Sequence, residues 1–153
     1  MSFDVAFVVL REGVTTGETQ EALERNNEND DGLDYVEVLA PFLDAQVPEA
    51  ELRARIEHAA LEVLVTSPFI EFREGHMYAK APPARRAQWI ASQMLEYQGG
   101  PGWVPASISF AGDVREFVRV IALMLTMLEG VCLCDPQTLQ VLDADEALEW
   151  AAP

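Results

Sequence analysis

The segment from Asn27 to Gly32 comes closest, in residue type and spacing, to a known ion-binding pattern. Oxygen-bearing side chains on alternate residues, followed by glycine at the sixth place, are typical of the opening of an EF-hand calcium loop. The pattern fails at the first place, which holds Asn27 instead of aspartate. It fails again at the twelfth place, where Val38 replaces the bidentate glutamate. We therefore predict a solvated polar loop at 26–32 and no metal site.

The two histidines and two cysteines offer little further chemistry. His58 has Glu62 four residues later on a predicted helix, but the second histidine of an HExxH site is absent, and His76 lies on another element. Cys132 and Cys134 share one face of a predicted strand, and two thiolates do not complete a tetrahedral site. We predict two buried, inert cysteines and no cofactor.

Motifs of nucleophilic and phosphate-transfer enzymes are also missing. The chain has no Gly-x-Ser-x-Gly sequence, and the glycine-rich segment 99–102 precedes a predicted strand, whereas a nucleotide cradle precedes a helix. The sequence therefore favours a protein that is not an enzyme. A small enzyme that uses a carboxylate with His58 or His76 is kept as an alternative.

The length and composition predict one globular domain spanning residues 1–153. Half of the residues are hydrophobic and a quarter are charged, as in ordinary folded domains. The segment Met1 to Asp4 lacks the basic start of a secretory signal, and only two cysteines occur, so we expect a cytoplasmic protein. The uncharged run from Val120 to Leu128 is too short to span a membrane.

Negative charge is concentrated in two segments. The chain has 26 acidic and 10 basic residues, a net charge of −16. Residues 12–51 hold twelve acids and one base, and residues 135–153 hold five acids and no base. Such a field repels nucleic acids and anionic membranes and attracts cationic partners, so we expect neither direct nucleic-acid binding nor membrane binding.

Hydrophobic periodicity predicts an α+β fold in which helices pack on a mostly antiparallel sheet of about six or seven strands. The strand at 3–10 is apolar on both faces after Asp4, which is typical of a central strand. Strands are predicted at 3–10, 34–39, 69–73, 76–80, 104–110, 131–134 and 139–142, and helices at 18–27, 48–66, 82–97, 113–129 and 143–151.

The order of these predicted elements repeats. Segments 34–97 and 104–151 both read strand, helix, hairpin, helix, with a possible boundary at the glycine-rich stretch 98–103. Residue identity between the two segments is negligible, so the repeat concerns element order alone.

We predict a small acidic protein-binding module of the immunity or inhibitor type, which neutralises a basic partner such as a bacterial toxin or a nucleic-acid-binding protein. Steering by the acidic field would speed the encounter, and a buried aromatic or apolar centre would hold the complex. The predicted contact residues form two acidic patches: Glu18, Glu21, Glu28, Asp30, Asp31 and Asp34, and Asp143, Asp145, Glu149 and Trp150.

Two further classes of function fit the sequence. A DNA mimic would need carboxylates spaced like phosphates along one elongated face. A self-associating structural protein would use the apolar richness of 117–134. The oligomeric state therefore stays open.

Overall fold

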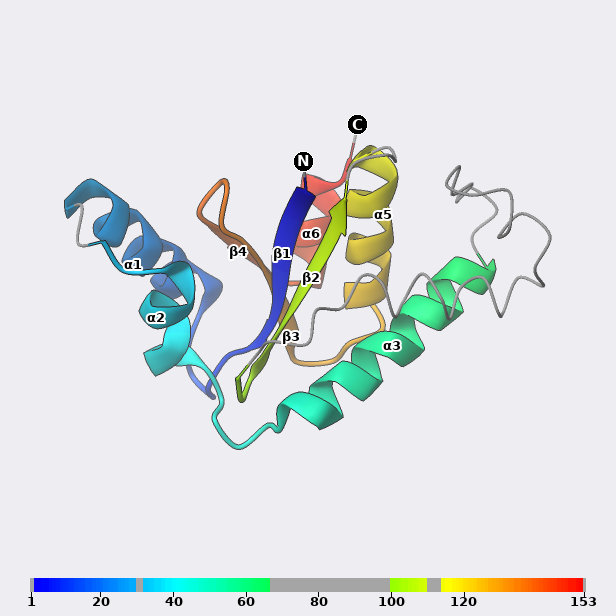
Figure 1. Cartoon of the computed structure of the whole chain (residues 1–153), viewed down its shortest axis with the longest axis horizontal. Helices are drawn as coiled ribbons and strands as arrows, with labels where there is room; N and C mark the ends of the chain where they lie inside the picture. Colours follow the sequence, from blue (N-terminus) through cyan, green and yellow to red (C-terminus); the bar gives the residue numbers. More distant parts are fainter. Residues whose placement is uncertain (1, 30–31, 67–99, 110–113, 153) are drawn as a thin grey trace.

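Four strands form the antiparallel sheet on which the described part of the chain is built (Figure 1). They are β1 (Ser2–Val9), β2 (Trp103–Ser109), β3 (Val131–Asp135) and β4 (Gln140–Leu142), in the spatial order β2-β1-β3-β4. The computed structural model describes residues 2–29, 32–66, 100–109 and 114–152.

Strand β1 lies between β2 and β3 and is buried on both faces, which confirms the central strand predicted from its apolar sequence. Val5 and Phe7 point into a first core cluster, and Ala6 and Val8 point into a second core cluster on the opposite face. The alternation follows from the period of two along a strand.

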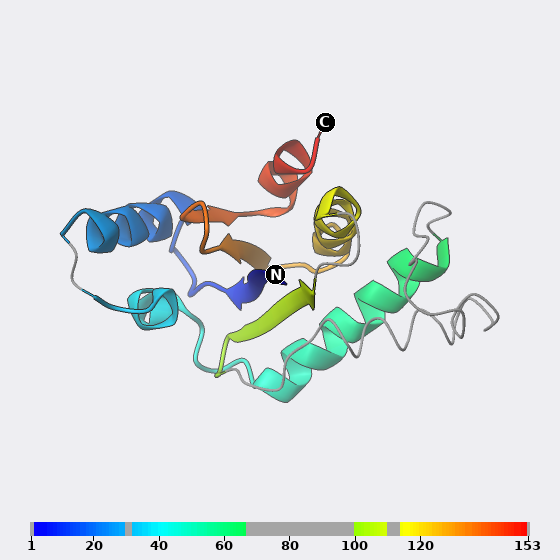
Figure 2. The same ribbon diagram turned by 45° about the horizontal axis from the view of Figure 1, so that its top comes forward.

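The helices cover both faces of the sheet, as Figure 2 shows. On the side of the second core cluster lie α1 (Thr16–Asn29) and α2 (Tyr35–Leu39), the latter followed by one turn of 3₁₀ helix, Ala40–Phe42. On the side of the first core cluster lie α3 (Glu49–Thr66), α5 (Val114–Leu125) and α6 (Ala144–Trp150). No helix in the described ranges is long and apolar enough to cross a bilayer.

Helix α3 confirms the helix predicted at 48–66. Leu52, Ile56, Ala59 and Val63 recur at helical spacing and are buried against the first core cluster. Glutamates in the first turn favour the positive end of the helix dipole.

Helix α5 ends at Leu125, four residues before the predicted end at Glu129. The next residues form a tight turn, in which the Met127 and Leu128 amides donate to carbonyls three residues earlier. Gly130 adopts a φ of 77°, a left-handed conformation that glycine takes without steric cost, and the chain then enters β3. The turn replaces the last predicted helical turn.

The C-terminal hairpin and α6 are confirmed. Asp135 ends β3, and its carboxylate accepts hydrogen bonds from the Gln137 amide (3.1 Å) and the Thr138 hydroxyl (2.8 Å), which fixes the turn into β4. Asp143 and Glu146 form a capping box at the start of α6.

The predicted strand at 34–39 is wrong, because these residues form α2. The Asp34 side chain accepts a hydrogen bond from the Val36 amide at 3.4 Å and caps the helix. Tyr35, Val38 and Leu39 then lie on one face, at helical spacing, and pack on the second core cluster.

The predicted sheet of six or seven strands is also wrong: the described residues form one four-stranded antiparallel sheet with five α-helices, and the α+β class is retained. The pseudo-repeat loses its basis, since its first unit begins with α2 instead of a strand. The predicted hairpin at 69–80 and the helix at 82–97 lie outside the described residues. The predicted polar loop at 26–32 is wrong for residues 26–29, because α1 continues to Asn29, and Asp30 and Asp31 lie outside the described residues.

Candidate functional site

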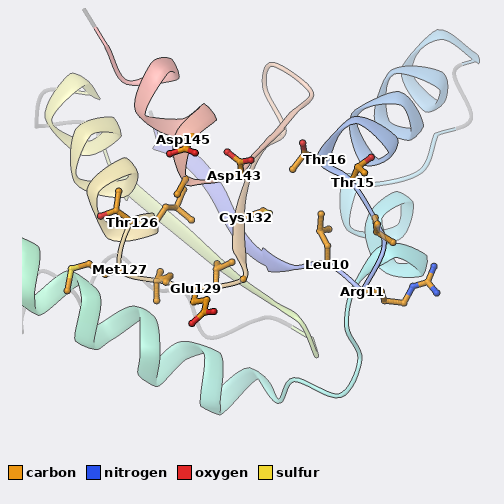
Figure 3. A pocket seen from close by; sticks show the side chains of 16 residues that line it. Leu10, Arg11, Thr15, Thr16, Thr126, Met127, Glu129, Cys132, Asp143 and Asp145 are labelled. Carbon is orange, nitrogen blue, oxygen red and sulfur yellow. The ribbon is translucent and has the colours of Figure 1, made fainter.

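An open hollow of about 820 Å³ lies where three segments meet (Figure 3). These are the loop from β1 to α1, the turn from α5 to β3, and the start of α6. The hollow falls in the size range of sites that bind small molecules or a few partner side chains. Asp143 and Asp145 lie on one side of it and Glu129 on the opposite side, with Cys132 between them (Figure 3).

The loop from β1 to α1 is fixed by backbone contacts. The Arg11 amide donates to the Phe42 carbonyl at 2.8 Å, and the Val14 amide donates to the Arg11 carbonyl at 3.1 Å. The Thr15 hydroxyl accepts a hydrogen bond from the Glu18 amide at 3.2 Å, which caps the start of α1. Leu10 and Val14 on this loop line the hollow and are half-buried.

A carboxylate links α1 to α6 beside the hollow. Oε1 of Glu146 accepts hydrogen bonds from the Thr16 hydroxyl and from the Asp143 amide, both at 3.1 Å. Asp143 in turn accepts a hydrogen bond from the Glu146 amide at 2.9 Å. The first turns of the two helices are therefore held at a fixed separation, with Asp145 exposed next to them.

The opposite side of the hollow is formed by the turn after α5. Nη2 of Arg55 on α3 donates to the Glu129 carbonyl at 2.8 Å, which joins α3 to this turn. The Glu129 side chain is exposed, and Met127 is 47% exposed. Among the described residues, neither Glu129 nor Asp145 forms a side-chain ion pair.

The two cysteines point toward α1 and α2 from β3. Cys134 is buried, as predicted, whereas Cys132 is half-buried and lines the hollow. Burial raises the pKa of Cys132 to about 11, with smaller contributions from the charges of Asp143 and Glu146. Burial, and then the charge of Asp135, raises the pKa of Cys134 to about 12. Both thiols therefore stay protonated near neutral pH, the form that is a poor nucleophile and metal ligand.

The first predicted acidic patch lies mainly on the outer side of α1. Glu18, Glu21 and Glu28 are exposed there, opposite the buried Thr19 and Leu23. Glu21 pairs with Arg25 at 3.0 Å, which offsets part of its charge. The Asp34 side chain is exposed and caps α2, and Asp30 and Asp31 lie outside the described residues.

The second predicted patch is divided. Asp143 and Asp145 line the hollow, and Glu149 is exposed further along α6. Trp150 is half-buried and packs against the first core cluster. The structure thus brings two of the predicted contact residues to the hollow and places Trp150 at the edge of the core.

Glu129 and Met127 border the hollow but were absent from the predicted contact residues. The sequence predicts Glu129 as the last residue of a helix, before Gly130. An acid beside a helix-ending glycine also marks an exposed turn. Such a turn is a common place for binding residues.

Within the described ranges, no residues are placed to bind a metal or to carry out histidine chemistry. No group of three or more His, Cys, Asp or Glu residues is placed there to hold an ion. His58 is exposed on α3 and does not line the hollow. His76 lies outside the described residues.

No protein-family model, curated protein or solved structure matches the chain.

Proposed function

We propose that the chain is an acidic protein-binding module that docks onto and neutralises a basic partner protein, in the manner of an immunity or inhibitor protein. The observation that carries the proposal is the open hollow, which has exposed carboxylates on opposite sides and half-buried apolar side chains in its lining. The proposal includes a cytoplasmic location, in keeping with two free cysteines.

The placement of charge on α1 supports the proposal. The helix turns Leu23 and Thr19 inward and leaves four glutamates on its exposed side, with Arg25 as the one base in its sequence. Thr16 ties this helix to Glu146 at the border of the hollow. The negative field of α1 therefore adjoins the hollow.

Two effects would operate in the complex. The net charge of −16 raises the encounter rate with a cationic partner, an effect that salt screens. The half-buried apolar side chains of the hollow would then lose water on contact and slow dissociation.

Association kinetics test the proposal. The chain is immobilised, proteins retained at low salt and released at high salt are identified, and the purified partner is studied by stopped flow. We expect a basic partner whose association rate constant falls by about tenfold or more between about 0.02 M and 0.5 M NaCl. A partner without excess positive charge, or an association rate that does not change with salt, would contradict the proposal.

Catalysis is not part of the proposal. A small enzyme that uses His58 or His76 remains an alternative prediction, as does a DNA mimic. The nature of the captured partner separates them: a mimic would compete with duplex DNA for its partner, whereas the proposed module would also bind basic proteins that have no DNA site.

A further inference from the structure

The lining of the hollow combines polar groups with apolar side chains that are incompletely covered. Leu10, Val14, Cys132 and Ala144 line it and are half-buried, and Met127 is 47% exposed at its border. Apolar side chains combined with a few polar groups are typical of the lining of a binding site. We refer to Leu10, Val14, Cys132 and Ala144 as the floor.

Carboxylates stand on two opposite borders of this floor, as Figure 3 shows. Asp143 and Asp145 form the α6 rim, and Glu129 forms the turn rim. Arg11 also lines the hollow, but in Figure 3 its side chain extends away from Cys132 and from both aspartates. Arg55 reaches the Glu129 carbonyl, so the α6 rim carries the less compensated charge.

The end of α5 adds to the negative potential. Its last residue, Leu125, lines the hollow, and no basic residue occupies its last turn. The C-terminal end of a helix has a partial negative charge and favours cations. Burial raises the pKa of Cys132, and the charges of Asp143 and Glu146 raise it further.

We infer that the hollow binds a short extended segment of the partner protein, in which one apolar side chain contacts the floor and basic neighbours on either side reach the two rims. In an extended chain, successive side chains leave the backbone on opposite sides, so the basic neighbours of an apolar residue that faces the floor must bend back toward the rims. The long aliphatic stems of arginine and lysine let their charged ends reach the rims. This inference rests on the proposed function and assigns its contact point.

Peptide titration of the ¹⁵N-labelled chain, followed by NMR, tests the inference. The probe is the blocked pentapeptide Gly-Arg-Leu-Arg-Gly, compared with Gly-Arg-Gly-Arg-Gly and Gly-Glu-Leu-Glu-Gly at low salt. We expect the first peptide to shift amide signals in 126–132 and 143–145, the second to bind more weakly, and the third not to bind. Equal binding of the first two, or shifts confined to α1, would overturn the inference.

A pair of double variants supplies the control. Asp145→Asn with Glu129→Gln removes one carboxylate from each rim, and Glu51→Gln with Glu57→Gln removes two exposed carboxylates from α3. Like Asp145, Glu51 lies in the first turn of its helix. Each double variant therefore loses two negative charges, one of which lies at the positive end of a helix dipole. We expect the rim pair to weaken binding of the first peptide by about fivefold and the α3 pair by less than about twofold.

The outcomes separate this inference from the proposed function. If a basic partner associates with a steep salt dependence and the rim variants bind it normally, the hollow is not the contact point and the proposed function stands. If no basic partner is found and the first peptide does not bind even at low salt, both fail.

Discussion

At the scale of single residues, the thiol groups of Cys132 and Cys134 make the free energy of unfolding depend on pH. Burial raises both pKa values above the ordinary value of 9.0, to about 11 and about 12. Unfolding restores the ordinary value, so above pH 9 the unfolded chain loses thiol protons that the folded chain keeps. The free energy of unfolding therefore falls as pH rises from about 9 to 11, and thiol titration does not change it well below pH 9.

Replacing Cys134 isolates this effect. We expect Cys134→Ala to lower stability at pH 8 because a buried sulfur is lost, but to flatten the decline between pH 8 and pH 10 by about 1 kcal/mol. Urea unfolding at several pH values measures both quantities. Lysine and tyrosine titrate equally in the two proteins and cancel in the difference. An unchanged slope in the variant would contradict the assigned pKa of Cys134.

Gly102 is the residue at which backbone geometry most restricts the sequence. Its φ is +81°, its amide donates to the Val47 carbonyl at 2.9 Å, and its carbonyl accepts from the Val9 amide at 2.7 Å. A Cβ atom there would lie 2.8 Å from the Asp44 carbonyl oxygen. The residue thus joins the end of β1 to the segment that precedes α3, and a side chain has no space.

We expect Gly102→Ala to lower the free energy of unfolding by about 2–4 kcal/mol, from left-handed strain and the backbone overlap together. Gly13→Ala is the matched control, because Gly13 has a φ of +84° and nothing within 4 Å of the added atom. Its cost should be about 1 kcal/mol. Equal losses in the two variants, measured by urea unfolding, would show that the close approach at Gly102 does not matter.

At the scale of elements, α1 is weakly anchored. Of its 14 residues, Thr19 and Leu23 are buried. Its remaining links include the side-chain amide of Gln20, which donates to the Val141 carbonyl of β4 at 2.8 Å, and the hydrogen bond from Thr16 to Glu146. Because most helix stability in proteins comes from a packed apolar face, α1 should open more easily than the sheet.

Hydrogen exchange measures this difference. We expect α1 amides to exchange through an opening of lower free energy than β1 amides. Leu23→Ala should speed α1 exchange by about tenfold or more relative to β1, because truncation of a buried leucine costs about 2 kcal/mol or more. The exposed Glu24→Ala serves as control and should leave the ratio unchanged. Equal protection of α1 and β1 in the wild-type chain would show that the two form one cooperative unit.

The sequence predicts elements well where a pattern extends over several turns or residues. Three patterns each specify one structure: the helical spacing of apolar residues in α3, the apolar run of β1, and the capping box of Asp143 and Glu146. Segment 35–39 is ambiguous because its five residues satisfy both a period of two and the i, i+3, i+4 spacing. The side chain of Asp34, which caps the helix, decides between them.

The hollow could not be predicted from the sequence, and the reason is different. Its lining comes from three segments, near residues 10–16, 125–132 and 143–145, that only the folded sheet brings together. Asp143 and Asp145 were predicted as contacts from local charge, which requires no tertiary information. Glu129 lies within the segment 52–134, in which acids and bases balance, so local charge does not single it out. Its position opposite the α6 rim depends on the turn after α5.

At the scale of the whole molecule, net charge sets the dependence of stability on salt. A charge of −16 on a 153-residue chain repels itself, and folding brings these charges closer together. The surface pair of Arg25 and Glu21 is largely exposed and contributes little in the opposite direction. Salt should therefore weaken the repulsion between acidic residues more than it weakens the attraction within ion pairs.

We expect the melting temperature to rise by about 2–4 °C between about 0.02 M and 0.3 M NaCl, in proportion to roughly 1 kcal/mol of relieved repulsion. Chloride is preferred to sulfate, since sulfate also strengthens the burial of apolar surface. A variant with Glu18, Glu21, Glu24 and Glu28 changed to glutamine should melt higher at low salt and respond less to NaCl. A melting temperature that falls with NaCl would contradict this prediction, because it would mean that attractive charge pairs outweigh the repulsion in the folded chain.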